Sequence, residues 1–261
     1  MPKTYLSVNK INTHTYVLCT FICSRRKPSY IKLTGTLAEA EALYLPAHFN
    51  EIRLDVIRAL MRAHPLSTLV TQGDSGLIAN HIPMQTLDEP APLGCIRGHI
   101  ARANPLWRDY RSGTDALAIF QGPHTYISPS FYPSKAKSGE VVPTWNYAVV
   151  HANGSLKFIQ DVNWLREFVA GLTTTHEAPR ALPWKIEDAP APYIDKNLKQ
   201  IIGFEFSITA LQGKWKLSQN RSQADREGVL RNLESADDAD SRELAVALAS
   251  LESEREPPSA Q

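Results

Sequence analysis

Hydrophobic and polar residues alternate in short runs through the middle of the chain. In Ile201–Leu211, every second residue from Ile202 to Ile208 is apolar, which is the period of a β-strand with one buried face. Clusters of turn-forming residues separate such runs, so we expect antiparallel strands, and many short strands are typical of a barrel. The predicted strands are Leu66–Thr71, Leu77–Met84, Leu93–Ile100, Asp115–Gln121, Thr125–Ile127, Thr144–Val150, Leu156–Ile159 and Ile201–Leu211.

A helical period is predicted in four other segments. The first helix is expected to begin at a cap on Asn50 and to end before Pro65. Its apolar face is predicted to consist of Ile52, Val56, Leu60 and Ala63. The other helices are predicted at Asn104–Arg111, at Asp161–Leu172 and at Ser222–Leu233, and four prolines make the chain after Leu172 irregular until the last strand. Together the elements predict an α+β protein.

The stretch Phe120–His151 contains two of the strands around a loop rich in proline, serine and aromatic residues. In the second strand, Trp145, Tyr147, Val149 and His151 share one face. Two interpretations are open. The aromatic residues can fill the core of a hairpin, as they do in most strands, or they can line a pocket for a flat ligand.

Composition narrows the class of protein. A net charge of +1 gives no general reason to expect binding to nucleic acid or to an anionic membrane. Three cysteines, two of them near the N-terminus, do not make a disulfide framework, so we expect a reducing compartment, the cytoplasm. The hydrophobic content of 43% is sufficient for a sizeable core.

The two ends of the chain differ from its middle. Residues 1–42 are predicted to be a disordered or spurious extension, with translation starting near Leu43. The apolar run Tyr16–Cys23 is too short to span a bilayer, and Cys19 and Cys23 lack a second ligand pair for a metal. Residues 43–234 are predicted to form the domain, and residues 235–261 an acidic tail that is partly helical or disordered.

Five segments, in order, resemble one family. They are LYLPAHF (43–49), RGHIARANPLW (97–107), FQGPHTYISPSFY (120–132), VPTWNYAVVH (142–151) and KLSQNR (216–221). The chain resembles the PaiB-type FMN-binding negative transcriptional regulators, which belong to the wider FMN-binding split β-barrel group with the pyridoxamine-phosphate-oxidase-like proteins. The resemblance implies an antiparallel split β-barrel with flanking helices, FMN as the cofactor, and a homodimer that builds each flavin pocket from two subunits. Binding to DNA is implied by the resemblance alone.

The resemblance also directs attention to candidate cofactor ligands. FMN needs cations and free N–H groups for its phosphate, and an apolar or aromatic slot for its ring. Arg102 precedes a predicted helix start at Asn104 and is the first candidate for the phosphate, although a surface arginine beside an ordinary cap is the alternative. Gly98 nearby would allow a ligand or another backbone to approach closely. The remaining candidates are Trp215, Lys216, Gln219 and Arg221 after the last strand, and Asn80, His81, Trp145 and Asn146 for the edge of the flavin ring.

The sequence leaves three classes of function open. One hypothesis is a flavin-binding regulator or redox sensor, and another is a flavin-dependent oxidoreductase acting on a small molecule. A haem-handling relative on the same barrel is a third, since four histidines (His81, His99, His124 and His151) lie near strand ends, although none shows close ligand spacing. The sequence has no recognisable helix-turn-helix, no basic stripe and no G-x-S-x-G motif, so DNA binding and serine catalysis have no support of their own.

Overall fold

A computed structural model describes residues 6–11, 14–19, 43–73 and 76–255 of the chain. It divides the chain into two units, residues 1–42 and 43–261. In the first unit, β1 (Leu6–Ile11) and β2 (His14–Cys19) form an antiparallel hairpin. The remainder of the predicted extension, including Cys23, lies outside the described residues.

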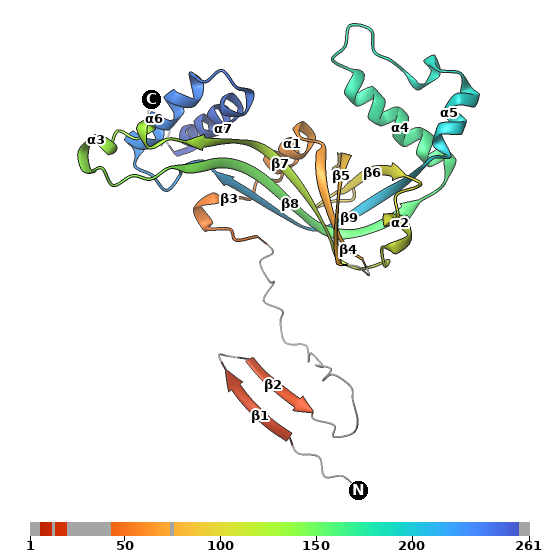
Figure 1. The fold of residues 1–261 in the computed structure, drawn as a ribbon, viewed down its shortest axis with the longest axis horizontal. Coiled ribbons are helices and arrows are strands. Elements are labelled where there is room, and N and C mark those ends of the chain that lie inside the picture. Colours follow the sequence, from red (N-terminus) through yellow and green to blue (C-terminus); the bar gives the residue numbers. More distant parts are fainter. Residues whose placement is uncertain (1–5, 12–13, 20–42, 74–75, 256–261) are drawn as a thin grey trace. The chain divides into compact units, whose positions relative to one another are not determined.

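The second unit is built on a seven-stranded antiparallel sheet (Figure 1). The strands follow the order β3-β9-β6-β5-β4-β7-β8, and β9 also pairs with β8, which closes six of them into a ring. Closure removes exposed strand edges, where unpaired N–H and C=O groups would otherwise lie. The strands are β3 (Asn50–Glu51), β4 (Leu66–Gly73), β5 (Gly76–Leu87), β6 (Cys95–Ala101), β7 (Ala116–Ile127), β8 (Thr144–Ile159) and β9 (Ile201–Lys216).

The ring is closed along only part of β9. From Ile201 to Ser207 this strand pairs with β6 on one edge, and from Gly203 to Lys216 it pairs with β8 on the other. Its second half therefore runs past the end of β6 and meets only β3 there, at Gly213 and Lys214. The predicted class, an α+β fold with an antiparallel split barrel and flanking helices, is confirmed.

The core lies inside this barrel, where alternate residues of each strand point. Phe204 and Phe206 of β9 are fully buried and require glycine opposite them. A Cβ on Gly98 would lie 2.4 Å from the ring of Phe204, and one on Gly154 would lie 2.6 Å from the ring of Phe206. Gly98 is therefore needed for packing of Phe204, and not for the approach of a ligand that we had considered.

The first helix begins later than predicted. Helix α1 spans Leu54–Ala63, because Asn50 and Glu51 pair with β9 as β3 instead of capping the helix. The carboxylate of Glu51 accepts a hydrogen bond from the backbone N–H of Arg53 (2.9 Å) at the helix start. The predicted buried face is wrong at Ile52, which is 76% exposed, and at Ala63, which is also exposed. The side chains that α1 buries are Ile57, Leu60 and Met61.

The remaining helices gather at the two ends of the barrel (Figure 1). At one end lie α2 (Leu106–Asp109), α4 (Val162–Glu177), which Asp161 caps as predicted, and α5 (Ala191–Leu198), which forms in the proline-rich segment expected to be irregular. Single 3-10 turns, η1 (Ala47–Phe49), η2 (Pro129–Phe131) and η3 (Ile186–Asp188), and the short helix α3 (Lys135–Ser138) lie in the connections. Within the described residues, no helix is both long enough and apolar enough to cross a membrane.

At the other end, α6 (Gln223–Glu234) and α7 (Ala239–Arg255) pack against the barrel. Leu244 and Leu248 of α7 are fully buried and belong to the same core cluster as the barrel strands. Arg226 of α6 forms an ion pair with Glu252 of α7 (2.7 and 2.8 Å). The core therefore continues past residue 234, where the sequence pattern had placed the end of the domain.

We expect the substitution Leu248→Ala to destabilise the domain by about 2–5 kcal/mol, because it leaves a cavity in the core. The matched control is Val246→Ala on the same helix, whose side chain is 71% exposed and which should change stability by less than about 0.5 kcal/mol. Urea denaturation of both variants measures the difference. Equal stability of the two would show that α7 does not pack as described.

Candidate functional site

Two lysines mark one face of the β8–β9 ladder. Lys214 and Lys216 are two residues apart on β9, so both point to the same side, away from the barrel core. Their partners on β8 are Val149 and Tyr147, and the next pair along the ladder is His151 with Gln212. We call this set, Tyr147, Val149, His151, Gln212, Lys214 and Lys216, the lysine face.

The two ammonium groups have no acidic partner among the described residues. Lys214 Nζ donates to the backbone oxygen of Tyr44 (2.8 Å) and lies 5.3 Å from the centre of the Tyr44 ring. Lys216 Nζ donates to Thr144 Oγ1 (2.6 Å) and to the backbone oxygen of Trp145. Because a lysine carries three donors, each ammonium keeps at least one for a further acceptor.

The charges of this face repel one another. Burial lowers the pKa of Lys216, and the positive charges of Lys214 and Arg221 lower it further. A bound anion would offset this repulsion and fill the free donor positions. The lysine face is therefore suited to a phosphate.

Two buried polar atoms on the same face have no hydrogen-bond partner within the described part of the chain. They are Nδ1 of His151 and Oε1 of Gln212, and these two residues pair across the ladder. Burial, followed by the charge of Lys214, lowers the pKa of His151, so its imidazole is neutral at pH 7. A neutral imidazole and an amide are a donor–acceptor pair for the polar edge of a ring.

The turn after β9 is held by the chain itself. Asn146 is fully buried and donates to Ser218 Oγ (3.1 Å), and Ser218 adopts a left-handed backbone with φ of 67°. Gln219 accepts from the N–H of Leu217 (2.7 Å) and donates to the backbone oxygen of Trp215. Asn146 and Gln219, both candidate ligands, thus position the residues that follow Lys216.

Two other candidates lie near this turn. The Arg221 guanidinium lies 5.0 Å from the centre of the Tyr132 ring and adds its charge to that of the lysines. Trp215 pairs with Ala148 on the opposite face of the ladder, and only 6% of it is exposed. Its ring packs in the core, because residues that alternate with Lys214 and Lys216 point inward. In this structure Trp215 cannot form the wall of a pocket on the lysine face.

Trp145 lies at the end of the lysine face and is 52% exposed. The His124 ring stacks on it at 6.0 Å, and the Tyr126 ring meets it edge to face at 6.3 Å. We call His124, Tyr126 and Trp145 the aromatic patch. Tyr132 of the motif 120–132 is instead buried within the single chain, and so is Tyr110, which follows the motif 97–107.

The first-choice candidate, Arg102, lies elsewhere. Its guanidinium donates to the backbone oxygens of Lys199 (2.7 Å) and Ile201 (3.3 Å) and to Gln160 Oε1 (2.9 Å). These bonds join the end of β6 to the start of β9. Asn104 donates to Asn80 Oδ1 (2.8 Å) in the same region. Arg102 thus has a structural use for its donors within this chain.

The structure divides the predicted ligands into two groups. Ile201, beside Arg102, and Lys216 are fifteen residues apart on β9, which corresponds to roughly 50 Å of strand. His81 belongs to neither group: it is exposed on the outer face opposite Thr68, whereas its neighbour Asn80 points inward. In residues 43–73 and 76–254, no three His, Cys, Asp or Glu side chains lie close enough to hold a metal ion.

Sequence reasoning included Lys214 only within the segment Lys214–Arg221, considered His151 only for haem or as part of a strand face, and missed Gln212. The predicted strand ended at Leu211, so the shared face of Lys214 and Lys216 became visible only when β9 proved to continue to Lys216. The pairing of His151 with Gln212 depends on the register of β8 and β9, for which the sequence gives no signal.

The fold defines a split-barrel protein, and the lysine face is a candidate site for a phosphate and a polar ring edge. Comparison with known families agrees with this class. Residues 43–210 match the model of the family described as "Putative FMN-binding domain", and the chain belongs to this family. Its cofactor is FMN.

Similar proteins occur in bacteria and fungi. The chain is 31% identical over 203 residues to the protease synthase and sporulation protein PAI 2 of Bacillus subtilis, covering 78% of this chain and 95% of that protein. It is 33% identical over 229 residues to an uncharacterized protein of Emericella nidulans, covering 74% and 90%. Among solved structures it is similar to the FAD and heme binding protein from Mycobacterium smegmatis, with a TM-score of 0.48, 14% identity and coverage of 64% and 73%.

The residues present fit FMN. Two lysines without an acidic partner suit its phosphate, and the unpartnered Nδ1 of His151 and Oε1 of Gln212 suit the polar edge of its ring. The candidate site therefore consists of Lys214, Lys216, His151 and Gln212, with Arg221 adding charge.

We expect Lys216→Ala to weaken FMN binding about ten- to a hundredfold, because it removes a charge-assisted contact. Lys157→Ala, an exposed lysine of the same ladder, is the matched control and should bind like the parent. Arg102→Ala tests the alternative phosphate ligand in the same flavin titration. If Arg102→Ala abolishes FMN binding and Lys216→Ala binds FMN like the parent, the phosphate site lies at the other end of β9.

Acid should destabilise the domain through two partly buried histidines. Burial lowers the pKa of His99 and of His151 below the ordinary value of about 6.5. At a pH between the lowered pKa and about 6.5, the unfolded chain therefore binds more protons than the folded one. Stability therefore falls as the pH falls through about 6.5. Urea denaturation at pH 7.5 and 5.5 measures the loss, in a range that leaves the carboxylates ionised.

The double variant His99→Gln, His151→Gln should lose less stability between these two pH values than the parent. Exposed His176→Gln is the control and should keep the parental dependence. An unchanged pH dependence in the double variant would contradict the assignment of the two histidines as buried and neutral.

Proposed function

We propose that the protein is a cytoplasmic FMN-binding regulator or redox sensor whose flavin lies on the lysine face. The observation that carries this proposal is the pair of lysines that donate only to neutral oxygens, beside two unpartnered polar atoms. Lys214 and Lys216 bind the phosphate. His151 and Gln212 hydrogen-bond the edge of the ring, whose flat side lies against Val149.

FMN, when bound, supplies one- and two-electron redox chemistry. The chain contributes the fixed positive charge at the phosphate and the neutral imidazole at the ring edge. Because His151 is neutral at pH 7, it can either donate or accept a hydrogen bond, and so can respond to a change in the protonation of the ring. A redox sensor needs such a contact to pass the state of the flavin to the protein.

The regulator is proposed to act as a homodimer. The aromatic patch next to Lys216 includes Trp145, 52% exposed, and Tyr126, 48% exposed, and aromatic residues are enriched in the cores of interfaces. Arg102, with Asn80 and Asn104, lies beside the start of β9, too far from the lysine face to reach a flavin there in its own chain. Only a second chain could bring these residues to that flavin. A dimer therefore accommodates both groups of predicted ligands.

Repression of transcription comes to this proposal from the family resemblance. A net charge of +1 does not favour a large DNA interface, so any contact with DNA would use a local basic surface. Reduction of the flavin is proposed to change the affinity of the dimer for DNA, which is the difference between states that a sensor requires.

A flavin-dependent oxidoreductase is the second candidate, and His151 favours it. A buried neutral imidazole next to a flavin can exchange a proton with a substrate during electron transfer. Under this alternative, His151→Gln should slow turnover while leaving FMN bound.

One set of experiments separates the two functions. The FMN-loaded protein is mixed with NADH or NADPH under anaerobic conditions and flavin absorbance is followed. In parallel, binding to the DNA that precedes its own coding region is measured with oxidised and with dithionite-reduced protein. We expect slow reduction by the nicotinamides and an at least tenfold difference in DNA affinity between the redox states.

Rapid reduction of the flavin by NADH or NADPH, with the same DNA affinity in both redox states, would reject the sensor in favour of the enzyme. Light scattering of the same sample tests the dimer. A protein that holds FMN as a monomer at micromolar concentration would contradict the shared site.

A further inference from the structure

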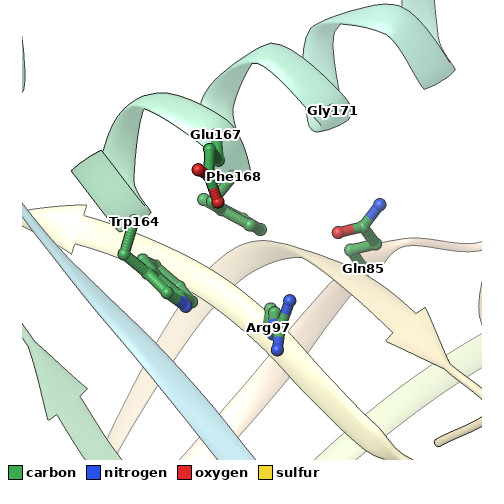
Figure 2. Close-up of a pocket in the computed structure, with 6 residues that line it drawn as sticks. All are labelled: Gln85, Arg97, Trp164, Glu167, Phe168 and Gly171. Atoms are coloured by element: carbon green, nitrogen blue, oxygen red, sulfur yellow. The ribbon is translucent and has the colours of Figure 1, made fainter.

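A cavity outside the lysine face lies between helix α4 and the outer face of the sheet. It has a volume of about 130 Å³ and is lined by Gln85, Arg97, Trp164, Glu167, Phe168 and Gly171. Figure 2 shows the side chains of Trp164, Glu167 and Phe168 reaching from the helix toward Gln85 and Arg97, which rise from the strands. The lysine face uses none of these residues.

Register and helical spacing bring these residues together. Gln85 of β5 pairs with Arg97 of β6, which pairs with Glu205 of β9, so the three side chains lie on one face of the sheet. Trp164 and Phe168 are four residues apart on α4 and therefore face the sheet together. The contact is close, because a Cβ on Gly203 below would lie 2.3 Å from the Trp164 ring.

The walls of the cavity are flat and fixed. The rings of Trp164 and Phe168 stack with centres 5.2 Å apart and an angle of 14° between their planes. The Arg97 guanidinium lies 5.6 Å from the centre of the Trp164 ring. Glu205 holds it there through bonds to Nε (3.0 Å) and Nη2 (2.9 Å). A flat molecule would find aromatic and guanidinium planes already in position.

Polar groups line the solvent-accessible edge of the same cavity, where Glu167 is exposed and Gln85 is partly buried. The amide of Gln85 and the carboxylate of Glu167 form no hydrogen bond or ion pair with any residue that the structure describes. A carboxylate accepts only, whereas an amide both donates and accepts. A molecule that donates to Glu167 and accepts from Gln85 would satisfy both.

Gly171 keeps the space open. It lies inside a sixteen-residue helix, where glycine is less favourable than alanine. No atom lies within 4 Å of a Cβ built there, so close packing does not require glycine at this position. A larger side chain at this position would extend into the cavity. A ligand in the cavity would therefore account for the glycine.

We propose that this cavity binds a small molecule with one flat ring that carries both a hydrogen-bond donor and an acceptor, such as a heteroaromatic amide or amine. A cavity of about 150 Å³ holds one benzene ring, so this smaller one takes at most one flat ring, with its polar substituent at the mouth beside the exposed Glu167, and it is too small for the three-ring flavin. Glu205 and Lys214 are nine residues apart on β9, roughly 30 Å of strand. The site is therefore separate from the lysine face and takes an effector, not the cofactor.

Nicotinamide and cytosine are the probes for this site, and benzene and benzoate are the controls. Binding to the FMN-loaded protein is followed by calorimetry and by the NMR signal of the Trp164 indole N–H, assigned with Trp164→Phe. We expect nicotinamide or cytosine to bind and to shift that signal. Benzene lacks polar groups and benzoate is repelled by Glu167, so each should bind at least tenfold more weakly.

Two variants locate the site. Gly171→Leu should fill the cavity and abolish binding, and Glu167→Gln should weaken it about ten- to a hundredfold, because a charge-assisted bond is lost. Exposed Thr174→Leu on the same helix is the control and should bind like the parent. Flavin titration of each variant checks that the lysine face is intact.

The proposal is overturned if neither probe binds at millimolar concentration, or if Gly171→Leu binds as well as the parent. Parental binding in Glu167→Gln with loss in Gly171→Leu would reject the polar recognition and leave only an apolar gap. Because FMN binding is measured separately, failure of this site is distinguishable from failure of the flavin site.

Discussion

The antiparallel ladder between β8 and β9 is the constraint on which the rest of the structure depends. It closes the sheet, and it is made from the two longest strands, each of sixteen residues. Without this ladder the barrel would expose two long edges to solvent and its aromatic core would lie open. The second half of the ladder extends past β6, so its outer surface, the lysine face, remains available for a ligand.

The same ladder explains why the core and the charged site can occupy one strand. The register of the ladder shifts between Asn153 and Gly154, which changes the residues of β9 that point inward. Phe204 and Phe206 therefore point inward from its first half, whereas Lys214 and Lys216 point outward from its second half. Burial, and then the charges of Lys214 and Arg221, lower the pKa of Lys216, so neighbouring cations here are unfavourable in the free protein. A bound anion would offset this cost, which makes the lysine face a candidate site for a phosphate.

The helical segment between β8 and β9 adds a different kind of surface. Helix α4 packs on the outer face through Trp164 and Phe168, yet leaves a polar cavity at Gly171. The lysine face and this cavity lie near opposite ends of β9. A rigid strand common to both is a physical connection through which an effector could alter the flavin environment.

Strand periods and turn residues by themselves determined the α+β class, most strands, and the caps at Asp161 and Ser222, because these depend on neighbours in the chain. The start of α1 could not be predicted, since Asn50 pairs with Lys214, far away in sequence. The same reason applies to Arg102, whose donors are taken by residues 160–201, and to α7, whose leucines need the barrel to bury them. The sequence indicated only part of the candidate site. Lys216 and Arg221 lie close together along the chain, whereas His151 pairs with Gln212 only through the register of β8 and β9. Tertiary structure decided which polar groups found partners and which were left for a ligand, because pairing depends on distance in space and not along the chain.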